Sequence, residues 1–265
     1  MHPFIYHRPA NVNDAVTLAA KGPDHKLLAG GQSLVQAMKL RLSSPSDVID
    51  LGSIKDLSGI KASGSEVTIG AMTRHAEVEK SPEVRKAIPA LAALAGQIGD
   101  RQVRAMGTLG GALANNDPAA DYPAAVLGLG ATIVTNKRRI PADEFFKGLF
   151  ETALAQGELI TSVVFPVPKR AAYTKFKNQA SRFAIVGVFV AESSSGVRVA
   201  VTGAGPCVFR QKDMEKALAA KFSPESVAGV KQAASGLNSD LHAGAEYRAH
   251  LVTVMAKRAV ENSLK

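Results

Sequence analysis

The stretch KLLAGGQSLVQAMKL, residues 26–40, decides the fold of the first part of this chain. An apolar segment that suits a buried strand leads into Gly30 and Gly31, and an apolar segment with helical spacing follows. Glycine adopts a positive φ and exposes its bare backbone, so the pair predicts a tight strand-to-helix turn. The amide N–H groups of such a turn, with the hydroxyl of Ser33, suit a phosphate group. A tight turn that binds nothing is an equally good interpretation of this stretch alone.

Around this turn, the first fifty residues predict the order strand, helix, strand, helix, strand. The strands are expected at residues 4–6, 26–29 and 48–51, and the helices at residues 12–19 and 34–40. A second module is expected from about residue 53. Its expected elements are a hairpin over residues 59–69, helices at 73–80, at 88–98 and from Asp117 onward, and strands at 131–134 and 159–164.

The last hundred residues predict strands first and helices afterwards, which is typical of an α+β module. The strands are expected at residues 173–176, 184–190 and 197–201, and the helices at 213–220, 224–235 and 246–262. The chain is therefore expected to be an α+β protein of two domains. The expected domains are residues 1–168, divided into modules 1–52 and 53–168, and residues 169–265.

A second glycine-rich turn, Gly107-Thr108-Leu109-Gly110-Gly111-Ala112, repeats the chemistry of the first. Two such turns, each beside a helix and each offering amide N–H groups, suit a ligand whose diphosphate is held from both sides. FAD is such a ligand. Asp121 follows the second turn, and a carboxylate there needs hydroxyl or N–H donors, which the ribityl chain or flavin ring would supply. A solvent-facing acid at the start of a helix is the simpler interpretation of Asp121 alone.

The composition excludes several classes of protein. The 265 residues include one cysteine, Cys207, so no disulfide can form within the chain. One thiolate is also too few for an iron–sulfur cluster, and the six histidines show no metal-ligand spacing. No apolar run approaches the ~18 residues that cross a bilayer, and the first residues do not have the pattern of a secretory signal. A cytoplasmic protein without a metal site of its own is expected.

The net charge of +9 gathers partly in two basic stretches, residues 137–139 and 169–177. Neither has the aromatic interleaving of a single-strand binding groove, and the chain has no tryptophan. A solvated surface or an acidic protein partner is therefore expected in preference to a nucleic acid. No nucleophile with a neighbouring base stands out, so no catalytic residue is assigned.

Three parts of the chain resemble the FAD-binding medium subunit of carbon monoxide dehydrogenase and related molybdenum hydroxylases of the xanthine dehydrogenase family. The first is AGGQS at residues 29–33 with MKLRL at 38–42. The second is IGDRQVR at residues 98–104, followed by GTLGG at 107–111 and DPAAD at 117–121. The third is VTGAG at residues 201–205 with AEYR at 245–248. The likeness covers essentially the whole chain, and the paired glycine turns at this separation are specific.

The resemblance implies a two-part FAD-binding domain of the vanillyl-alcohol oxidase (PCMH) type, followed by a C-terminal domain with an antiparallel sheet and helices. Gln32 stands where some relatives have histidine. The two turns would hold the FAD diphosphate, through Ala29, Gly30, Gly31, Gln32 and Ser33 and through Thr108, Leu109, Gly110, Gly111 and Ala112.

The resemblance also implies roles for residues outside the turns. Asp121 would bind the ribityl or flavin portion of FAD, and Leu159 or Ile160 would line the ring pocket. Lys177 would sit at the polar edge of the flavin. Phe183 stands where relatives often have a ring-shielding tyrosine, so it would keep the stacking and lose the hydroxyl.

The implied function is electron transfer, because substrate hydroxylation in such enzymes belongs to another subunit. A large subunit would carry the molybdenum cofactor, and a small subunit would carry 2Fe–2S clusters that pass electrons to FAD in this chain. Two such heterotrimers would form the complete complex. The resemblance leaves the final acceptor open between quinone, nicotinamide and oxygen, and a quinone would bring the complex to a membrane surface as a peripheral protein.

Two other functions remain open at this stage. One is a stand-alone flavin-dependent alcohol oxidase of the same broad fold, for which the chain is short because it needs its own substrate domain. The other is a cofactor-free basic scaffold or RNA-binding module that uses the net charge of +9. Bound flavin in the purified chain separates the last of these from the others.

Overall fold

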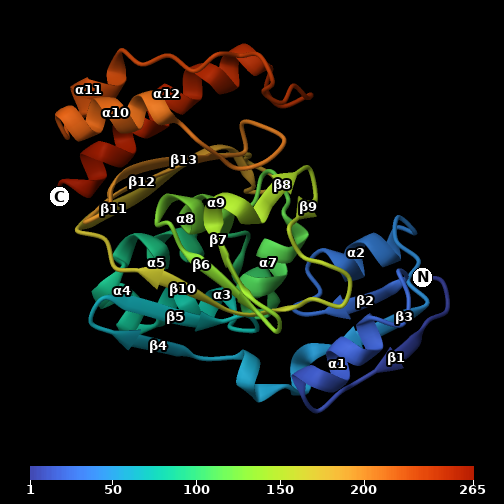
Figure 1. The fold of residues 1–265 in the computed structure, drawn as a ribbon. Coiled ribbons are helices and arrows are strands. Elements are labelled where there is room, and N and C mark those ends of the chain that lie inside the picture. The colour runs from blue at the N-terminus through green and yellow to red at the C-terminus, as the bar shows by residue number, and fades with distance from the viewer.

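A computed structural model describes all residues, 1–265, as three parts that follow one another along the chain (Figure 1). The N-terminal part lies at one side of the molecule, and the C-terminal helices lie over the middle part (Figure 1). The N-terminal elements are β1 (Ile5–His7), α1 (Val12–Ala19), β2 (His25–Leu28), α2 (Leu34–Lys39) and β3 (Asp47–Asp50). This order confirms the one that the sequence predicts.

The N-terminal sheet is parallel, with the strand order β1-β3-β2. Helix α1 begins where the side chain of Asn11 accepts a hydrogen bond from the amide of Asp14, at 2.9 Å. Ala15 and Ala19 on this helix are buried against Ile49 and Leu51 in a small core of seven residues. The first glycine turn joins β2 to α2 at one end of this sheet.

The middle part is built on a five-stranded antiparallel sheet in the order β4-β5-β10-β6-β7. Two 3-10 turns, η1 (Leu51–Ser53) and η2 (Lys55–Leu57), lead into it. Its strands, with the small β8–β9 pair, are β4 (Ile60–Ser63), β5 (Glu66–Gly70), β6 (Thr132–Thr135), β7 (Arg139–Pro141), β8 (Phe146–Gly148), β9 (Glu151–Thr152) and β10 (Ile160–Pro166). Its helices are α3 (His75–Lys80), α4 (Pro82–Ala87), α5 (Pro89–Gly96), α6 (Arg101–Met106), α7 (Leu109–Asn115), α8 (Tyr122–Gly128) and α9 (Ala142–Phe145).

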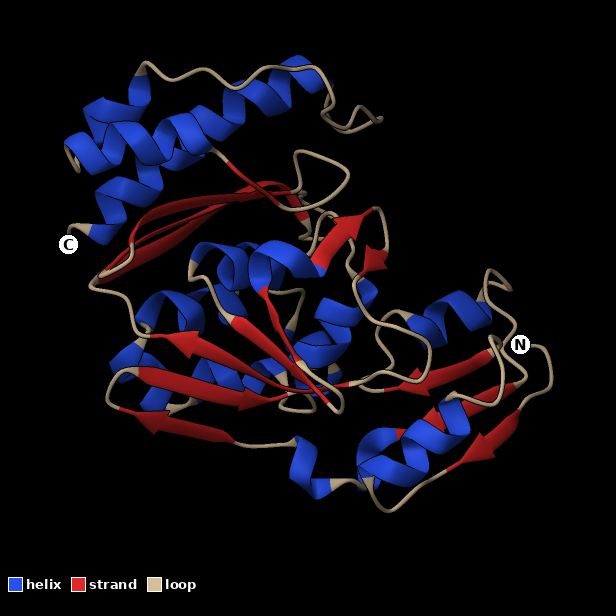
Figure 2. Cartoon of the chain, viewed as in Figure 1, coloured by secondary structure: helices blue, strands red, loops and turns tan.

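The C-terminal part has a four-stranded antiparallel sheet that lies between two layers of helices (Figure 2). Its elements are β11 (Arg170–Lys177), β12 (Ala184–Ser193), β13 (Gly196–Thr202), β14 (Phe209–Arg210), α10 (Lys212–Ala220), α11 (Pro224–Ala228) and α12 (Ala245–Ser263). Alternate residues of a strand face opposite sides of a sheet. Tyr173 and Phe189 accordingly pack into the main core of the middle part, and Val188 and Val190 pack under the C-terminal helices. None of the helices in the chain is both long and apolar enough to span a bilayer.

Two predicted helices are wrong in extent. Residues 117–121 form an irregular segment, and α8 begins only at Tyr122. The carbonyl of Pro118 accepts hydrogen bonds from Gly203 N and Thr202 Oγ1, and these contacts with β13 replace the bonds of a helical turn. The helix expected at residues 224–235 ends at Ala228. The residues between it and the start of α12 are not helical.

Candidate functional site

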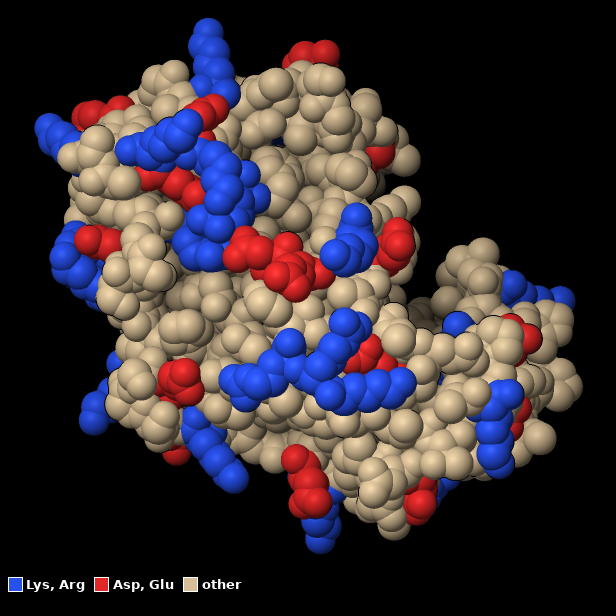
Figure 3. Space-filling view, viewed as in Figure 1, with Lys and Arg blue, Asp and Glu red and all other residues tan.

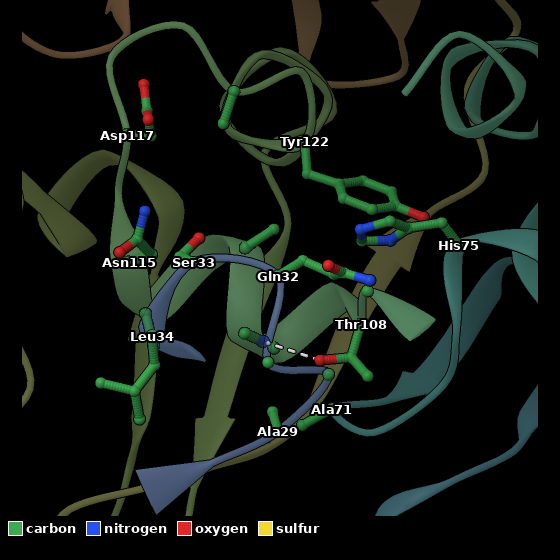
Figure 4. Close-up of a pocket in the computed structure, with 18 of the residues that line it drawn as sticks. Ala29, Gln32, Ser33, Leu34, Ala71, His75, Thr108, Asn115, Asp117 and Tyr122 are labelled. Carbon is green, nitrogen blue, oxygen red and sulfur yellow. Dashed lines mark hydrogen bonds between the residues drawn. The ribbon is translucent and has the colours of Figure 1, made fainter. Parts of the chain in front are cut away.

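A cavity of about 550 Å³ lies where the three parts of the chain meet (Figure 4). Its volume is within the range of sites that hold cofactors and other small ligands, ~300–1,000 Å³. The lining begins at Lys26 in the N-terminal part, includes both glycine turns, and ends at Phe183 beyond β11. The surface is visibly hollowed beside the N-terminal part (Figure 3).

The two glycine turns touch each other at the centre of this cavity. A Cβ atom added to Gly30 would lie 2.2 Å from the carbonyl oxygen of Met106 and 2.7 Å from the Cα of Gly107. At Gly110, an added Cβ would lie 2.6 Å from the Cβ of Ala71. Gly31 has a φ of +73°, which side chains with a Cβ rarely adopt. The glycines therefore serve backbone contact between the turns as well as the approach of a ligand.

The turns differ in the hydrogen-bond donors that they offer. The amides of Gly30, Gly31, Gln32 and Ser33 make no hydrogen bond within the protein. In the second turn, Leu109 N donates to Thr73 O, Gly110 N to Ala71 O, and Gly111 N to Thr108 Oγ1 (dashed in Figure 4). The sequence suggests two equivalent amide cradles, but only the first turn has a row of free amides. The second turn shapes the cavity.

The cavity collects most of the residues that the sequence singles out. Leu109 and Lys177 are the exceptions: Leu109 is fully buried in the main core, and Lys177 ends β11 as an exposed side chain. The residues that line the cavity are Ala29, Gly30, Gly31, Gln32, Ser33, Thr108, Gly110, Gly111, Ala112, Asp121, Leu159, Ile160 and Phe183. Their roles toward a ligand remain predictions.

Leu159 and Phe183 lie in different surroundings within this lining. Leu159 packs in the small N-terminal core beside Leu51. Phe183 is 48% exposed and belongs to the turn between β11 and β12, where Arg182 Nη1 reaches the carbonyl of Gly99 at 3.4 Å. The lining therefore offers a ligand both an apolar wall and a half-exposed aromatic ring.

Asp121 forms a buried ion pair with Lys175. Its predicted position at the start of a helix does not indicate such a partner. Both of its carboxylate oxygens lie within 3.0 Å of Lys175 Nζ, and the hydroxyl of Tyr173 donates to Oδ1. The side chains of Asp121 and Lys175 are 4% and 1% exposed. Burial raises the pKa of Asp121, and Lys175 and Tyr173 oppose that rise.

His75 and Tyr122 line the cavity although nothing in the sequence marks them. Their ring centroids are 5.2 Å apart, and the nitrogen-bearing edge of His75 points toward the cavity above Gln32 and Thr108 (Figure 4). Burial, with a smaller contribution from the charge of Arg104, lowers the pKa of His75 to about 4. The imidazole is therefore neutral near pH 7, and its Nδ1 has no hydrogen-bond partner.

Comparison with known proteins gives matches over almost the whole chain. Residues 2–168 match the family described as the FAD binding domain in molybdopterin dehydrogenase, and residues 171–263 match the CO dehydrogenase flavoprotein C-terminal domain. The nicotine 6-hydroxylase medium subunit of Paenarthrobacter nicotinovorans is 38% identical, over 96% of this chain and 95% of that protein. The carbon monoxide dehydrogenase medium chain of Hydrogenophaga pseudoflava is 36% identical, over 97% of this chain and 96% of that protein.

The fold agrees with these matches. The solved carbon monoxide dehydrogenase of Hydrogenophaga pseudoflava, in a form that lacks the Mo-pyranopterin moiety, superposes with a TM-score of 0.91 at 36% identity. The superposition covers 100% of this chain and 99% of that one. The mixed fold of helices and sheets, the paired glycine turns in one cavity and these matches together show that the chain belongs to the FAD-binding medium subunits of the molybdenum hydroxylases, the family of carbon monoxide and xanthine dehydrogenases.

Proposed function

We propose that the cavity holds one FAD and that the chain transfers electrons through it as the medium subunit of a molybdenum hydroxylase. The observation that carries the proposal is the row of unbonded amides from Gly30 to Ser33. These amides lie in a turn whose Gly30 is pressed against the second glycine turn. Consecutive free N–H groups bind the oxygens of a phosphate, and a cavity of about 550 Å³ around them has room for a small ligand such as a dinucleotide.

The residues present fit each portion of FAD. The first turn and the hydroxyl of Thr108 suit the diphosphate, and Phe183 suits the face of the flavin ring. Leu159 and Ile160 supply an apolar wall for a ring, and Asp121 faces the ribityl or flavin portion. Lys177 is exposed and lies outside the cavity lining, so its role at the flavin edge stays a prediction. Bound FAD supplies the exchange of one or two electrons, and the protein supplies its position and surroundings.

The finer assignments extend this proposal. The FAD-binding domain is of the vanillyl-alcohol oxidase (PCMH) type and occupies residues 1–168, with modules 1–52 and 53–168, and the C-terminal domain occupies residues 169–265. The partners are a large molybdenum-cofactor subunit and a small 2Fe–2S subunit, in a cytoplasmic dimer of heterotrimers, with a quinone acceptor as a route to the membrane surface. Relatives named as medium subunits match across the whole chain, which disfavours a stand-alone oxidase and an RNA-binding module.

Added FAD should stabilise the purified chain. At a concentration 100 times the dissociation constant, a ligand that binds only the folded state adds about 2.7 kcal/mol. For a chain of this size, that free energy raises the melting temperature by roughly 5–10 °C. Thermal unfolding followed with and without FAD measures the shift, and FMN, which lacks the adenylate and the diphosphate, should produce a much smaller one. A chain that stays colourless after gel filtration with excess FAD and melts at an unchanged temperature contradicts the proposal.

The basic stretch at residues 137–139 is proposed to help dock the partner subunits. Its three side chains are exposed, but Arg138 binds the buried carboxylate of Glu158, with Nε 2.9 Å from Oε1. That contact makes Arg138 part of the fold. Lys137 and Arg139 are free to face a partner. On the face that Figure 3 shows, lysines and arginines lie in several groups with acids beside them.

Reversal of charge at Lys137 and Arg139 together should therefore weaken assembly without unfolding the chain. Exposed charge pairs contribute about 0.2–1 kcal/mol each, so loss of two should lower the affinity for the partner subunits by roughly 2- to 30-fold at low salt. Titration of the partners against the Lys137→Glu/Arg139→Glu variant measures this, and Lys61→Glu/Lys231→Glu is a control of equal charge. Equal assembly of both variants would place the docking surface elsewhere.

A further inference from the structure

A buried cluster of charged and polar groups lies behind the cavity wall, and it joins the C-terminal sheet to the middle part. Lys175 Nζ lies 2.9 Å from Asp121 Oδ1 and 3.0 Å from Oδ2, and it also donates to the carbonyl of Gln97 at 2.8 Å. Tyr173, two residues earlier on β11, donates to Asp121 Oδ1. Asp121 lines the cavity, and Lys175 does not.

The position of Lys175 follows from the alternation of β11. Tyr173 and Lys175 point to the face of the sheet that covers the middle part, and Thr174 between them points the other way and donates to Met255 O on α12. The ammonium of Lys175 thereby reaches the start of α8 through Asp121 and the end of α5 through Gln97. The residues after Gln97, Ile98 and Gly99, line the cavity. One lysine thus ties two segments of the cavity wall to the C-terminal sheet.

A buried ion pair of this kind adds little to the free energy of folding. Removal of an ammonium and a carboxylate from water costs several kcal/mol per ion, and apolar residues of similar volume often hold a core equally well. The pair is therefore better explained by the function of Asp121, the member that lines the cavity. Asp121 is the member that faces the ligand, and its charge is acceptable there only while Lys175 balances it.

We propose that Lys175 is a positioning residue of the cofactor site, which orients the Asp121 carboxyl group and balances its charge beside the bound flavin nucleotide. The inference rests on the proposed binding of FAD. Lys175 does not line the cavity, so it would act through Asp121. The first-turn amides belong to residues 30–33 in the N-terminal part, whereas Lys175 lies on β11 in the C-terminal part. The affinity for FAD would therefore depend on both parts of the chain.

The titratable groups that face Asp121 determine how the affinity for FAD should change with pH. They are Lys175 and Tyr173 on β11 and the neighbouring Tyr122 on α8. Burial raises the pKa of Asp121, and the ammonium of Lys175 opposes that rise. With a neutral residue at position 175, the buried carboxyl group loses its counter-charge, so its pKa rises further. The affinity for FAD should then change more with pH than it does in the native chain.

The test is the dissociation constant for FAD between pH 6 and pH 9, together with the visible absorption of the bound flavin, in a cycle of variants. Lys175→Met should bind FAD at least ~10-fold more weakly than the native chain, with an affinity and a flavin spectrum that change with pH. Lys175→Met/Asp121→Asn removes both charges, so it should regain most of the lost affinity and lose the pH dependence. Lys169→Met, at an exposed position just before β11, is the matched control and should bind like the native chain.

The outcomes separate this inference from the proposed function. Absence of FAD binding by the native chain overturns the proposed function itself. A native chain that binds FAD, with a Lys175→Met variant of equal and pH-independent affinity, overturns the role of Lys175. If Lys175→Met does not fold, Asp121→Asn forms the other leg of the cycle, because it leaves the ammonium unpaired. If the double variant then binds FAD no more tightly than either single variant, the cluster is merely structural and the inference is overturned.

Discussion

Replacement of Gly30 by alanine should lower the affinity for FAD by about 100-fold. The new Cβ would lie 2.2 Å from the carbonyl oxygen of Met106, a backbone atom that cannot rotate away as a side chain can. Either the first turn or the second must move, and overpacking of this kind costs up to about 3 kcal/mol, at the severe end of its usual range. Every 1.4 kcal/mol corresponds to a factor of ten in affinity. If the turn geometry is lost, the affinity for FAD should therefore fall by about two orders of magnitude.

Fluorescence titration with FAD measures the effect, with far-ultraviolet circular dichroism as the check on folding. Gly229→Ala is the matched control, because Gly229 has a φ of −90° and no atom within 4 Å of its added Cβ. It should bind FAD like the native chain. A Gly30→Ala variant with native affinity would show that the contact between the turns does not shape the binding site.

The stability of the cofactor-free chain should fall in mild acid because of His75. The pKa of this side chain is about 4 in the fold, against a usual value of 6.5, because burial disfavours the charged imidazolium. Between these two values the unfolded chain binds a proton that the folded chain excludes, so the free energy of unfolding falls as the pH falls. The shift corresponds to a loss of roughly 3 kcal/mol over this window. Above pH 6.5 the contribution should be constant.

Urea unfolding at a series of pH values from 7.5 to 4.5 measures the loss. Other groups also titrate there, so the decisive quantity is the difference between the native chain and His75→Leu. That variant has no group to protonate at this position, and its stability should depend less on pH by about the same 3 kcal/mol. His250→Gln replaces an exposed histidine and should keep the native dependence. Parallel curves for native and His75→Leu chains would contradict the expectation.

Much of the fold can be predicted from sequence because its signals are local. The strand, the glycine pair and the helix between residues 26 and 40 follow from hydrophobic spacing and from the freedom of glycine, and α1 follows from its cap at Asn11. The helix expected from Asp117 fails for the opposite reason. The carbonyls of that segment bond to β13, which lies far away in sequence, and no local pattern reports such a partner.

The site shows the same division. The glycine turns can be recognised one at a time, but the contact between Gly30 and Met106 is a product of tertiary structure. Lys175 and Lys177 have the same parity along a strand, so alternation alone cannot tell which of them is buried. The register of β11 against β12 shifts between Phe176 and Lys177, so the regular pairing ends just before Lys177. The place of His75 in the cavity lining cannot be predicted, because no pattern in the neighbouring sequence marks a buried histidine.

The spread of the cavity lining along the chain has a consequence for biosynthesis. The wall is assembled from segments between Lys26 and Phe183, and the partner of Asp121 is delivered by β11. A ribosome must therefore release more than two thirds of the polypeptide before the last wall is in place. Insertion of the nucleotide is a late event in the life of the nascent subunit, and truncated translation products cannot sequester it in a complete pocket.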